Sequence, residues 1–182
     1  MAGTYTSVGP SVDVTGEKLD LVTILADQRG MLAITARGIT DEQARRRTTV
    51  SEFTLASVIA HVASVIRGNV TMLEERDENS TVDFSGSGEP EVPESIEQVL
   101  AELESAGRAM EQCIAALGSL DDLIPQPTAP WAPERIWWTA RRVLLHLLRE
   151  IAHHSGHADI IREALDGQST MAVVAGDMGL EF

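Results

Sequence analysis

The sequence of 182 residues predicts an all-α protein, a four-helix bundle, on three observations. Apolar residues recur at intervals of three and four along four long segments, as on helices that bury one face. Segments rich in glycine, proline and polar residues separate these stretches, and two of the connections are long. No segment alternates convincingly between apolar and polar residues, as a half-buried strand would.

The first helix is predicted over residues 17–37, and a short helix is predicted to follow it. Gly38 stands where a glycine commonly follows a helix C-terminus. Thr40 and Gln43 have the three-residue spacing of a capping box, which marks the start of the short helix. The apolar positions of the first helix are Leu21, Ile24, Leu25, Met31, Leu32 and Ile34.

The second long helix is predicted over residues 51–76, with Ser51 as its N-cap. His61 lies at the edge of its apolar arc, which consists of Leu55, Val58, Ile59, Val62, Val65 and Ile66. The connection that follows, residues 77–93, is polar and rich in Gly, Pro and Ser. Compact domains rarely contain a connection of about 17 residues, so we expect a functional or mobile loop here.

The third helix is predicted over residues 95–117, capped by Ser95, and the fourth over residues 138–166, ended by Gly167. A proline-rich loop, from Asp121 to about Pro133, joins the two helices. Three tryptophans gather in this loop and at the start of the fourth helix, where they could line a pocket or pack the core: Trp131, Trp137 and Trp138.

These elements divide the chain into three parts. Residues 1–16 are small and polar and are predicted to be a flexible arm without the features of a signal peptide. Residues 17–170 form the predicted bundle domain, and residues 171–182 are predicted to be a C-terminal tail.

The composition limits the classes of partner. Apolar residues make up 43% of the chain, as in globular proteins. A net charge of −14 argues against binding to nucleic acid or to an anionic membrane, and no run of about 18 apolar residues predicts a membrane span. The single cysteine, Cys113, excludes an internal disulfide and is expected to be a small core residue. We therefore expect a cytoplasmic protein.

Histidines gather in the fourth predicted helix. Residues 146–157 hold four of the five histidines of the chain and one glutamate. At 100° per residue, spacings of three, four and seven return to one side of a helix, which places together His146, Glu150, His153, His154 and His157.

The i,i+4 pair Glu150 and His154 could converge on one divalent cation. If the bundle brings His61 opposite this pair, the three side chains form a three-ligand metal site. A purely structural alternative is a hydrogen-bonded ladder of His146, Glu150 and His154 along the helix. His153 stands about 100° from His154, so the two cannot both point at one centre.

Several of these motifs together resemble the DinB-like superfamily, in particular its uncharacterised actinobacterial branch. The resemblance extends from about Leu19 to Gly167. It rests on four motifs: Asp27-Gln28-Arg29, Gly38 to Ala44, a helix with His61, and His146 to Glu163 with Asp166-Gly167. The superfamily is similar in fold to the S-transferases that use mycothiol or bacillithiol, and to the mycothiol-dependent maleylpyruvate isomerase.

The resemblance implies a four-helix bundle that holds a divalent metal through His61, Glu150 and His154. Zinc is the first expectation for the metal, with nickel, iron and manganese as alternatives, because the ligand set alone does not select one. The sequence departs from the pattern at Ile66 and Asn69, where the branch usually has an acidic and an aromatic residue.

Two imidazoles and one carboxylate leave a coordination position open, and a thiol that enters it loses its proton. We therefore expect transfer of a mycothiol-type thiol to an electrophilic small molecule, in which His157 or His146 orients Glu150 or relays a proton. The alternatives are a non-enzymatic metal- or ligand-binding bundle associated with stress, and a metal-dependent hydrolase. A homodimer is left open.

Overall fold

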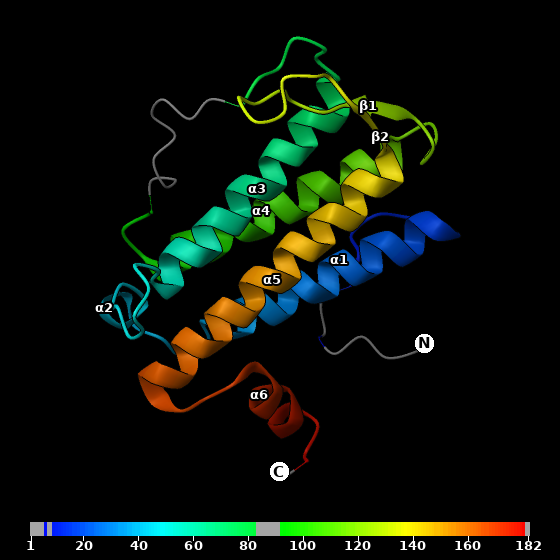
Figure 1. Ribbon diagram of the computed structural model, residues 1–182. Helices are drawn as coiled ribbons and strands as arrows, with labels where there is room; N and C mark the ends of the chain where they lie inside the picture. Colours follow the sequence, from blue (N-terminus) through cyan, green and yellow to red (C-terminus); the bar gives the residue numbers. More distant parts are fainter. Residues whose placement is uncertain (1–5, 7–8, 83–91, 181–182) are drawn as a thin grey trace.

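Four long helices lie side by side in the computed structural model, which describes Thr6, residues 9–82 and residues 92–180. They are α1 (Glu17–Ile34), α3 (Leu55–Glu75), α4 (Ile96–Ala116) and α5 (Ala140–Asp166), and Figure 1 shows them as one bundle. Helix α5 packs against both α1 and α3, and α4 covers α3 from another side. The predicted all-α four-helix bundle is confirmed.

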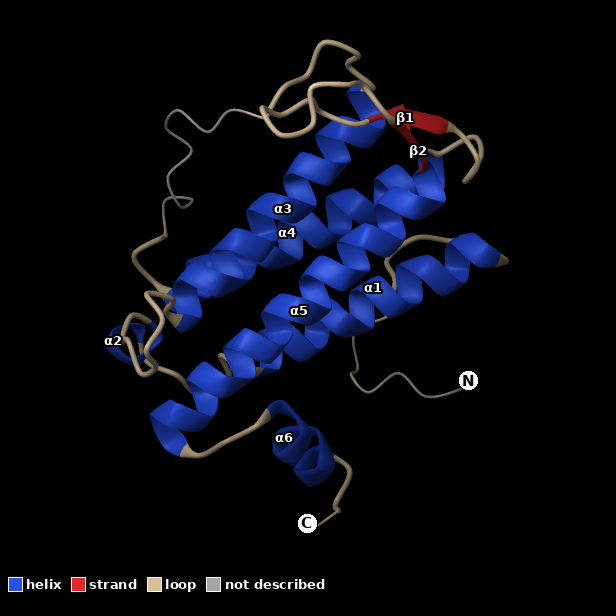
Figure 2. Ribbon diagram, in the orientation of Figure 1, coloured by secondary structure: helices blue, strands red, loops and turns tan. Residues whose placement is uncertain are grey.

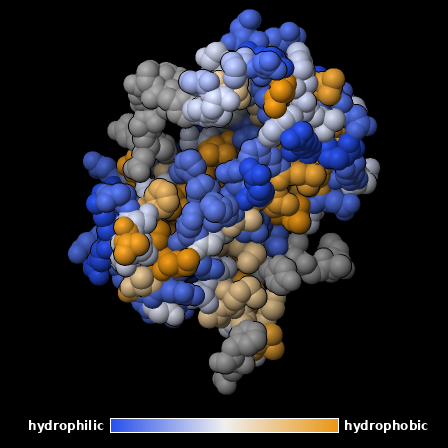
Figure 3. Space-filling view, viewed as in Figure 1, coloured by the Kyte–Doolittle hydropathy of each residue, from blue (hydrophilic) through white to orange (hydrophobic). Residues whose placement is uncertain are grey.

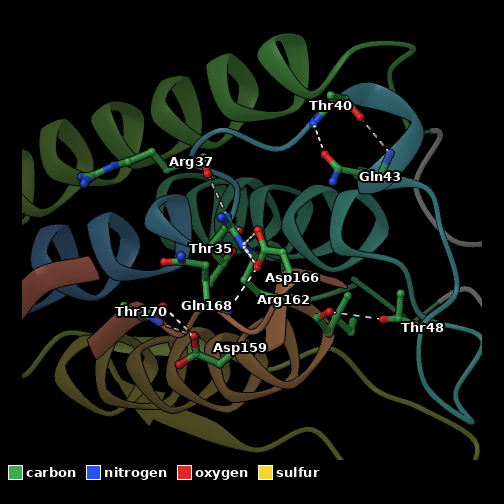
Figure 4. Close-up of polar contacts among 11 residues, drawn as sticks. Thr35, Arg37, Thr40, Gln43, Thr48, Asp159, Arg162, Asp166, Gln168 and Thr170 are labelled. Carbon is green, nitrogen blue, oxygen red and sulfur yellow. Dashed lines mark hydrogen bonds and ion pairs between the residues drawn. The ribbon is translucent and has the colours of Figure 1, made fainter. Parts of the chain in front are cut away.

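Local capping fixes where the helices begin. Helix α3 begins at Leu55, because the Thr54 side chain accepts a hydrogen bond from the backbone N–H of Ser57. The Ser57 side chain in turn accepts one from the backbone N–H of Thr54. The predicted start at Ser51 is therefore wrong by one turn. The short helix α2 (Asp41–Ala44) has the predicted capping box of Thr40 and Gln43, visible in Figure 4. Ser95 caps α4 as predicted.

A two-stranded antiparallel sheet closes the end of the bundle where α3 ends and α5 begins (Figure 2). Strand β1 (Leu123–Pro125) pairs with β2 (Trp137–Thr139), with Leu123 opposite Thr139. The sequence did not predict these strands, since three residues are too few to show an alternating pattern and one of the three in β1 is a proline. The sheet sets the loop between its strands against the end of α3.

Helix α6 (Thr170–Asp177) occupies most of the segment predicted to be a tail. Two hydrogen bonds attach it to α5, from the backbone N and the Oγ of Thr170 to Asp159 Oδ1, at 2.8 and 2.7 Å. Figure 4 shows this contact. Eight residues without clear helical periodicity gave no signal for this helix, and its attachment depends on a contact with another element.

The buried Arg162 on α5 closes the end of α1. Its Nη1 donates hydrogen bonds to the carbonyl oxygens of Thr35 and Arg37, at 2.6 and 2.9 Å, and its Nε donates to Asp166 (Figure 4). The last carbonyls of a helix have no partner within it, so a cation at this point satisfies them.

A second buried charge joins α1, α4 and the N-terminal arm. Arg29 is 5% exposed, and its Nη1 lies 3.1 Å from an oxygen of Glu111, which is 3% exposed. The backbone N and the Oγ of Ser11 donate to the other oxygen of Glu111, at 2.7 and 2.6 Å. A Cβ at position 107 would lie 1.7 Å from Arg29 Nη1, so Gly107 makes room for the guanidinium. The described part of the predicted flexible arm is thus held against the bundle.

Helix α3 alone among the described helices is long and apolar enough to cross a membrane by length and composition. Half of the apolar window is buried inside the protein, against α4 and α5. Burial in the bundle accounts for this hydropathy. On the face of the molecule in Figure 3, the apolar residues are interrupted by hydrophilic ones.

Candidate metal centre

Helices α3 and α5 run antiparallel, and their contact brings two histidines together (Figure 1). The ring centroids of His61 on α3 and His154 on α5 are 4.6 Å apart, with the ring planes at 61°. Both residues are partly buried. The sequence placed His61 and His154 on separate helices, and the structure brings the two side chains into contact.

The separation of these rings matches the geometry of a shared metal ion. An imidazole nitrogen lies about 2.0–2.1 Å from a bound zinc ion, which puts the ring centroid roughly 3.2 Å from the ion. If two such rings bind one ion, with an angle of about 90–110° at the ion between them, their centroids are roughly 4.5–5.2 Å apart. The His61–His154 pair fits this range.

The ring of His154 has the chemistry of a metal ligand. Its Nδ1 is buried and has no hydrogen-bond partner in the described part of the chain. Burial lowers the pKa of His154, and the imidazoles of His61, His157 and His153 lower it further against the opposing charge of Glu150. The neutral ring is the form that binds a metal, so this environment favours ligation.

Glu150 lies one turn before His154 on α5, and its carboxylate contacts other residues. Its Oε1 is 3.0 Å from Arg149 Nη2 and 3.4 Å from His146 Nδ1. Partial burial raises the pKa of Glu150, but the hydrogen bond from Arg149 and the nearby positive charge outweigh it, and the net shift is downward. The carboxylate is therefore ionised at neutral pH. In the described ranges, no three potential ligands converge closely enough to hold a metal as they stand.

Of the alternative ladder of His146, Glu150 and His154, only a contact between the first two residues is present. His146 contacts Glu150, whereas the Nδ1 of His154 takes no part, having no partner among the described residues. Of the two residues proposed as relays, His146 lies against Glu150, and its ring packs on Trp138 at a centroid distance of 5.3 Å. His157 lies beyond His154 from Glu150 and packs on Phe53, at 5.8 Å.

A cleft of about 600 Å³ opens beside this row of side chains. The C-terminal half of α3 forms one side, two loop segments form another, and His146 lines it from α5. The polar lining residues include Asn69, Glu75, Asp77, Ser80, Thr81 and Gln126. Because Val65, the first lining residue on α3, stands four residues after His61, the cleft begins about 6 Å along the helix from the histidine pair.

One arginine joins the two loop segments of the cleft. Arg135 Nη1 donates to the carbonyl oxygens of Ser80 and Gln126, at 2.8 and 2.6 Å. The predicted functional loop 77–93 thus contributes its first residues to the wall, and residues 83–91 lie outside the described part. Sequence reasoning missed Arg135 and Arg149 as neighbours of the site, since nothing in their spacing distinguishes them from surface residues. Trp138, one of the tryptophans expected to line a pocket or pack the core, contacts His146.

Cys113 is buried, as predicted, and burial raises the pKa of its thiol to about 11, with a further upward contribution from Glu74. At pH 8 only about one thiol in a thousand is ionised at that pKa, against about a quarter for a free cysteine. We expect iodoacetamide to alkylate the folded chain at least 100-fold more slowly than the unfolded chain, as followed by mass spectrometry. Equal rates would show that Cys113 is accessible and reactive.

Comparisons with known proteins agree with this fold. The family pattern described as Mycothiol-S-transferase matches residues 20–167. No curated protein matches the sequence significantly. A crystal structure of a conserved protein from Enterococcus faecalis superposes with a TM-score of 0.63 at 14% identity, covering 85% of this chain and 100% of the other. At that identity the superposition shows a common fold.

Proposed function

This chain belongs to the mycothiol S-transferase family, which is DinB-like, and we propose that it transfers a low-molecular-weight thiol to an electrophilic small molecule with a divalent metal ion. One observation carries the proposal: the His61–His154 pair has the spacing of a metal chelate, at 4.6 Å between ring centroids. Glu150 is one turn away, and the cleft begins beside the same row of side chains.

His61, His154 and Glu150 would hold the ion, and zinc fits two imidazoles and a carboxylate. A bound metal would supply a deprotonated thiol at neutral pH. The buried Nδ1 of His154, which lacks a partner among the described residues, supports the fit. Glu150 must turn its carboxylate from Arg149 toward His154 to complete the set, and its ionised state suits it to bind a cation.

His146 is the residue best placed to move a proton. It lines the cleft, and its Nδ1 faces Glu150 at 3.4 Å. An imidazole at this point can accept a proton from a thiol that enters along the cleft and release it to solvent through the cleft mouth. The ring contact with Trp138 holds the imidazole in position. In this proposal His157 supports His154 from the other side.

The cleft suits the polar part of a mycothiol-type thiol. Hydroxyl and amide side chains line it and can hydrogen-bond to a hydroxylated group, while Glu75 and Asp77 make it acidic. The departures from the family pattern act here. Asn69 presents an amide to the cleft where the resemblance leads one to expect an aromatic ring, whereas Ile66 is buried in the core, 2% exposed.

A metal-binding bundle without turnover is the second candidate. The observation that favours it is the carboxylate of Glu150, which contacts Arg149 and His146 rather than the histidine pair. In such a protein the family's bundle would bind metal, and Asn69 and Ile66 would have replaced residues that turnover needs.

The test is depletion of mycothiol by the metal-loaded protein with a panel of electrophiles. We expect the wild type to consume thiol at least 100-fold faster than Glu150→Ala, because removal of the carboxylate deprives the ion of a ligand. Glu163→Ala, which removes an exposed carboxylate from the same helix, is the matched control and should keep the wild-type rate. Equal rates for wild type and Glu150→Ala would contradict the proposed transferase activity and favour the second candidate, a metal-binding bundle without turnover.

A further inference from the structure

We propose that His153 and His157 form a second metal site, separate from the family's site, for a divalent cation that prefers imidazole ligands, such as Ni²⁺ or Cu²⁺. The two residues stand four positions apart on α5. Their ring centroids are 4.5 Å apart, with the ring planes at 77°. This separation lies at the short end of the range of roughly 4.5–5.2 Å for two imidazoles on one ion.

The pair is distinct from the His61–His154 pair in space. The ring of His154 is 5.5 Å from the ring of His153 and 5.5 Å from that of His157, which exceeds the chelate range in both cases. His153 and His154 are neighbours in the sequence, so their side chains leave the helix about 100° apart. One helix thus carries a ligand of the first site and both ligands of the second.

Two further features prepare His153 and His157 for a ligand. The Nδ1 of His157 is buried and has no hydrogen-bond partner in the described part of the chain, although a buried polar nitrogen normally has one. The ring of Phe53 packs against His157, which restricts its rotation before an ion binds. His153 is exposed, so an ion can reach the pair from solvent and keep water on its remaining positions.

The type of ligand selects the class of metal. Two imidazoles without a carboxylate suit Ni²⁺, Cu²⁺ and Zn²⁺, and disfavour Mg²⁺ and Ca²⁺, which take oxygen ligands. The net charge of −14 raises the local concentration of cations at the surface. With two protein ligands in place of three, this site is expected to bind more weakly than the first.

The probe is Ni²⁺ alone, titrated into the metal-free full-length chain by equilibrium dialysis. We expect His153→Ala to bind one equivalent less than wild type, and His154→Ala to retain that weaker equivalent. The matched control combines His153→Ala with Ala152→His. It keeps the number of histidines but places the pair five residues apart, and it should bind as little as His153→Ala.

Each outcome decides the matter. If wild type and His153→Ala bind the same amount of Ni²⁺, or the relocated histidine restores the equivalent, the second site does not exist. If His154→Ala loses every equivalent, the four histidines form one centre and the proposal is wrong. A wild type that binds one equivalent, lost in His153→Ala and kept in His154→Ala, would support the second site and reject the metal at His61 and His154. Circular dichroism of each variant checks that the helices are intact.

Discussion

Replacement of His154 with alanine is expected to abolish stoichiometric metal in the purified chain, whereas His153→Ala is expected to leave it nearly unchanged. His154 faces His61 at 4.6 Å between centroids and has a buried nitrogen without a partner among the described residues. His153 is exposed, and its side chain leaves the helix about 100° from that of His154. Residues that only support a metal ligand change affinity by about 10–100-fold, so loss of a ligand itself should exceed 100-fold.

The measurement is the metal content after exhaustive dialysis, by elemental analysis, with one equivalent expected for wild type and His153→Ala. Dialysis removes ions from the weaker pair of His153 and His157, so only the tight site is counted. Both variants lose one imidazole from adjacent positions of the same helix, which matches them in composition. Metal retained by His154→Ala would contradict the assignment of His154 as a ligand. Metal lost from His153→Ala as well would exchange the roles of the two residues.

The helices of the bundle could be predicted because their signal extends over many residues. Over the 18–27 residues of each long helix, apolar residues mark the buried face repeatedly, and one exception such as Gly30 does not hide the period. Strand β1, with three residues, and helix α6, with eight, do not repeat a period often enough. The start of α3 was misjudged because Ser51 and Thr54 are both good caps, and the reciprocal bond of Ser57 decides between them.

The candidate site could be predicted only in part. Spacing along α5 placed Glu150 and His154 one turn apart. His61 was the candidate opposite them on its own helical pattern, the resemblance supported it, and the structure brings it against His154. Which way Glu150 points depends on Arg149 and His146, and no periodicity encodes that preference. The cleft depends on Arg135, which connects segments 55 and nine residues away in the chain. Such long-range contacts follow from packing rather than from local pattern.

The largest loss of stability is expected from Glu111→Ala, at about 3 kcal/mol or more. Arg29 and Glu111 are both almost fully buried, so removal of the carboxylate leaves a guanidinium in the core without its closest buried partner. The same substitution removes the acceptor for both hydrogen bonds of Ser11 and so detaches the arm. Urea unfolding followed by circular dichroism should show a lower midpoint with an unchanged m value.

Glu104→Ala is the matched control, because Glu104 also contacts Arg29, at 3.2 Å, but is 42% exposed. Water screens this second pair, so its removal should cost about 1 kcal/mol or less. Glu111→Gln separates the two roles of Glu111, since the amide oxygen can still accept from Ser11 while the charge is lost. A cost for Glu111→Ala as small as that for Glu104→Ala would mean that Glu104 alone neutralises Arg29. Burial of the Arg29–Glu111 pair would then not be what fixes α4 against α1.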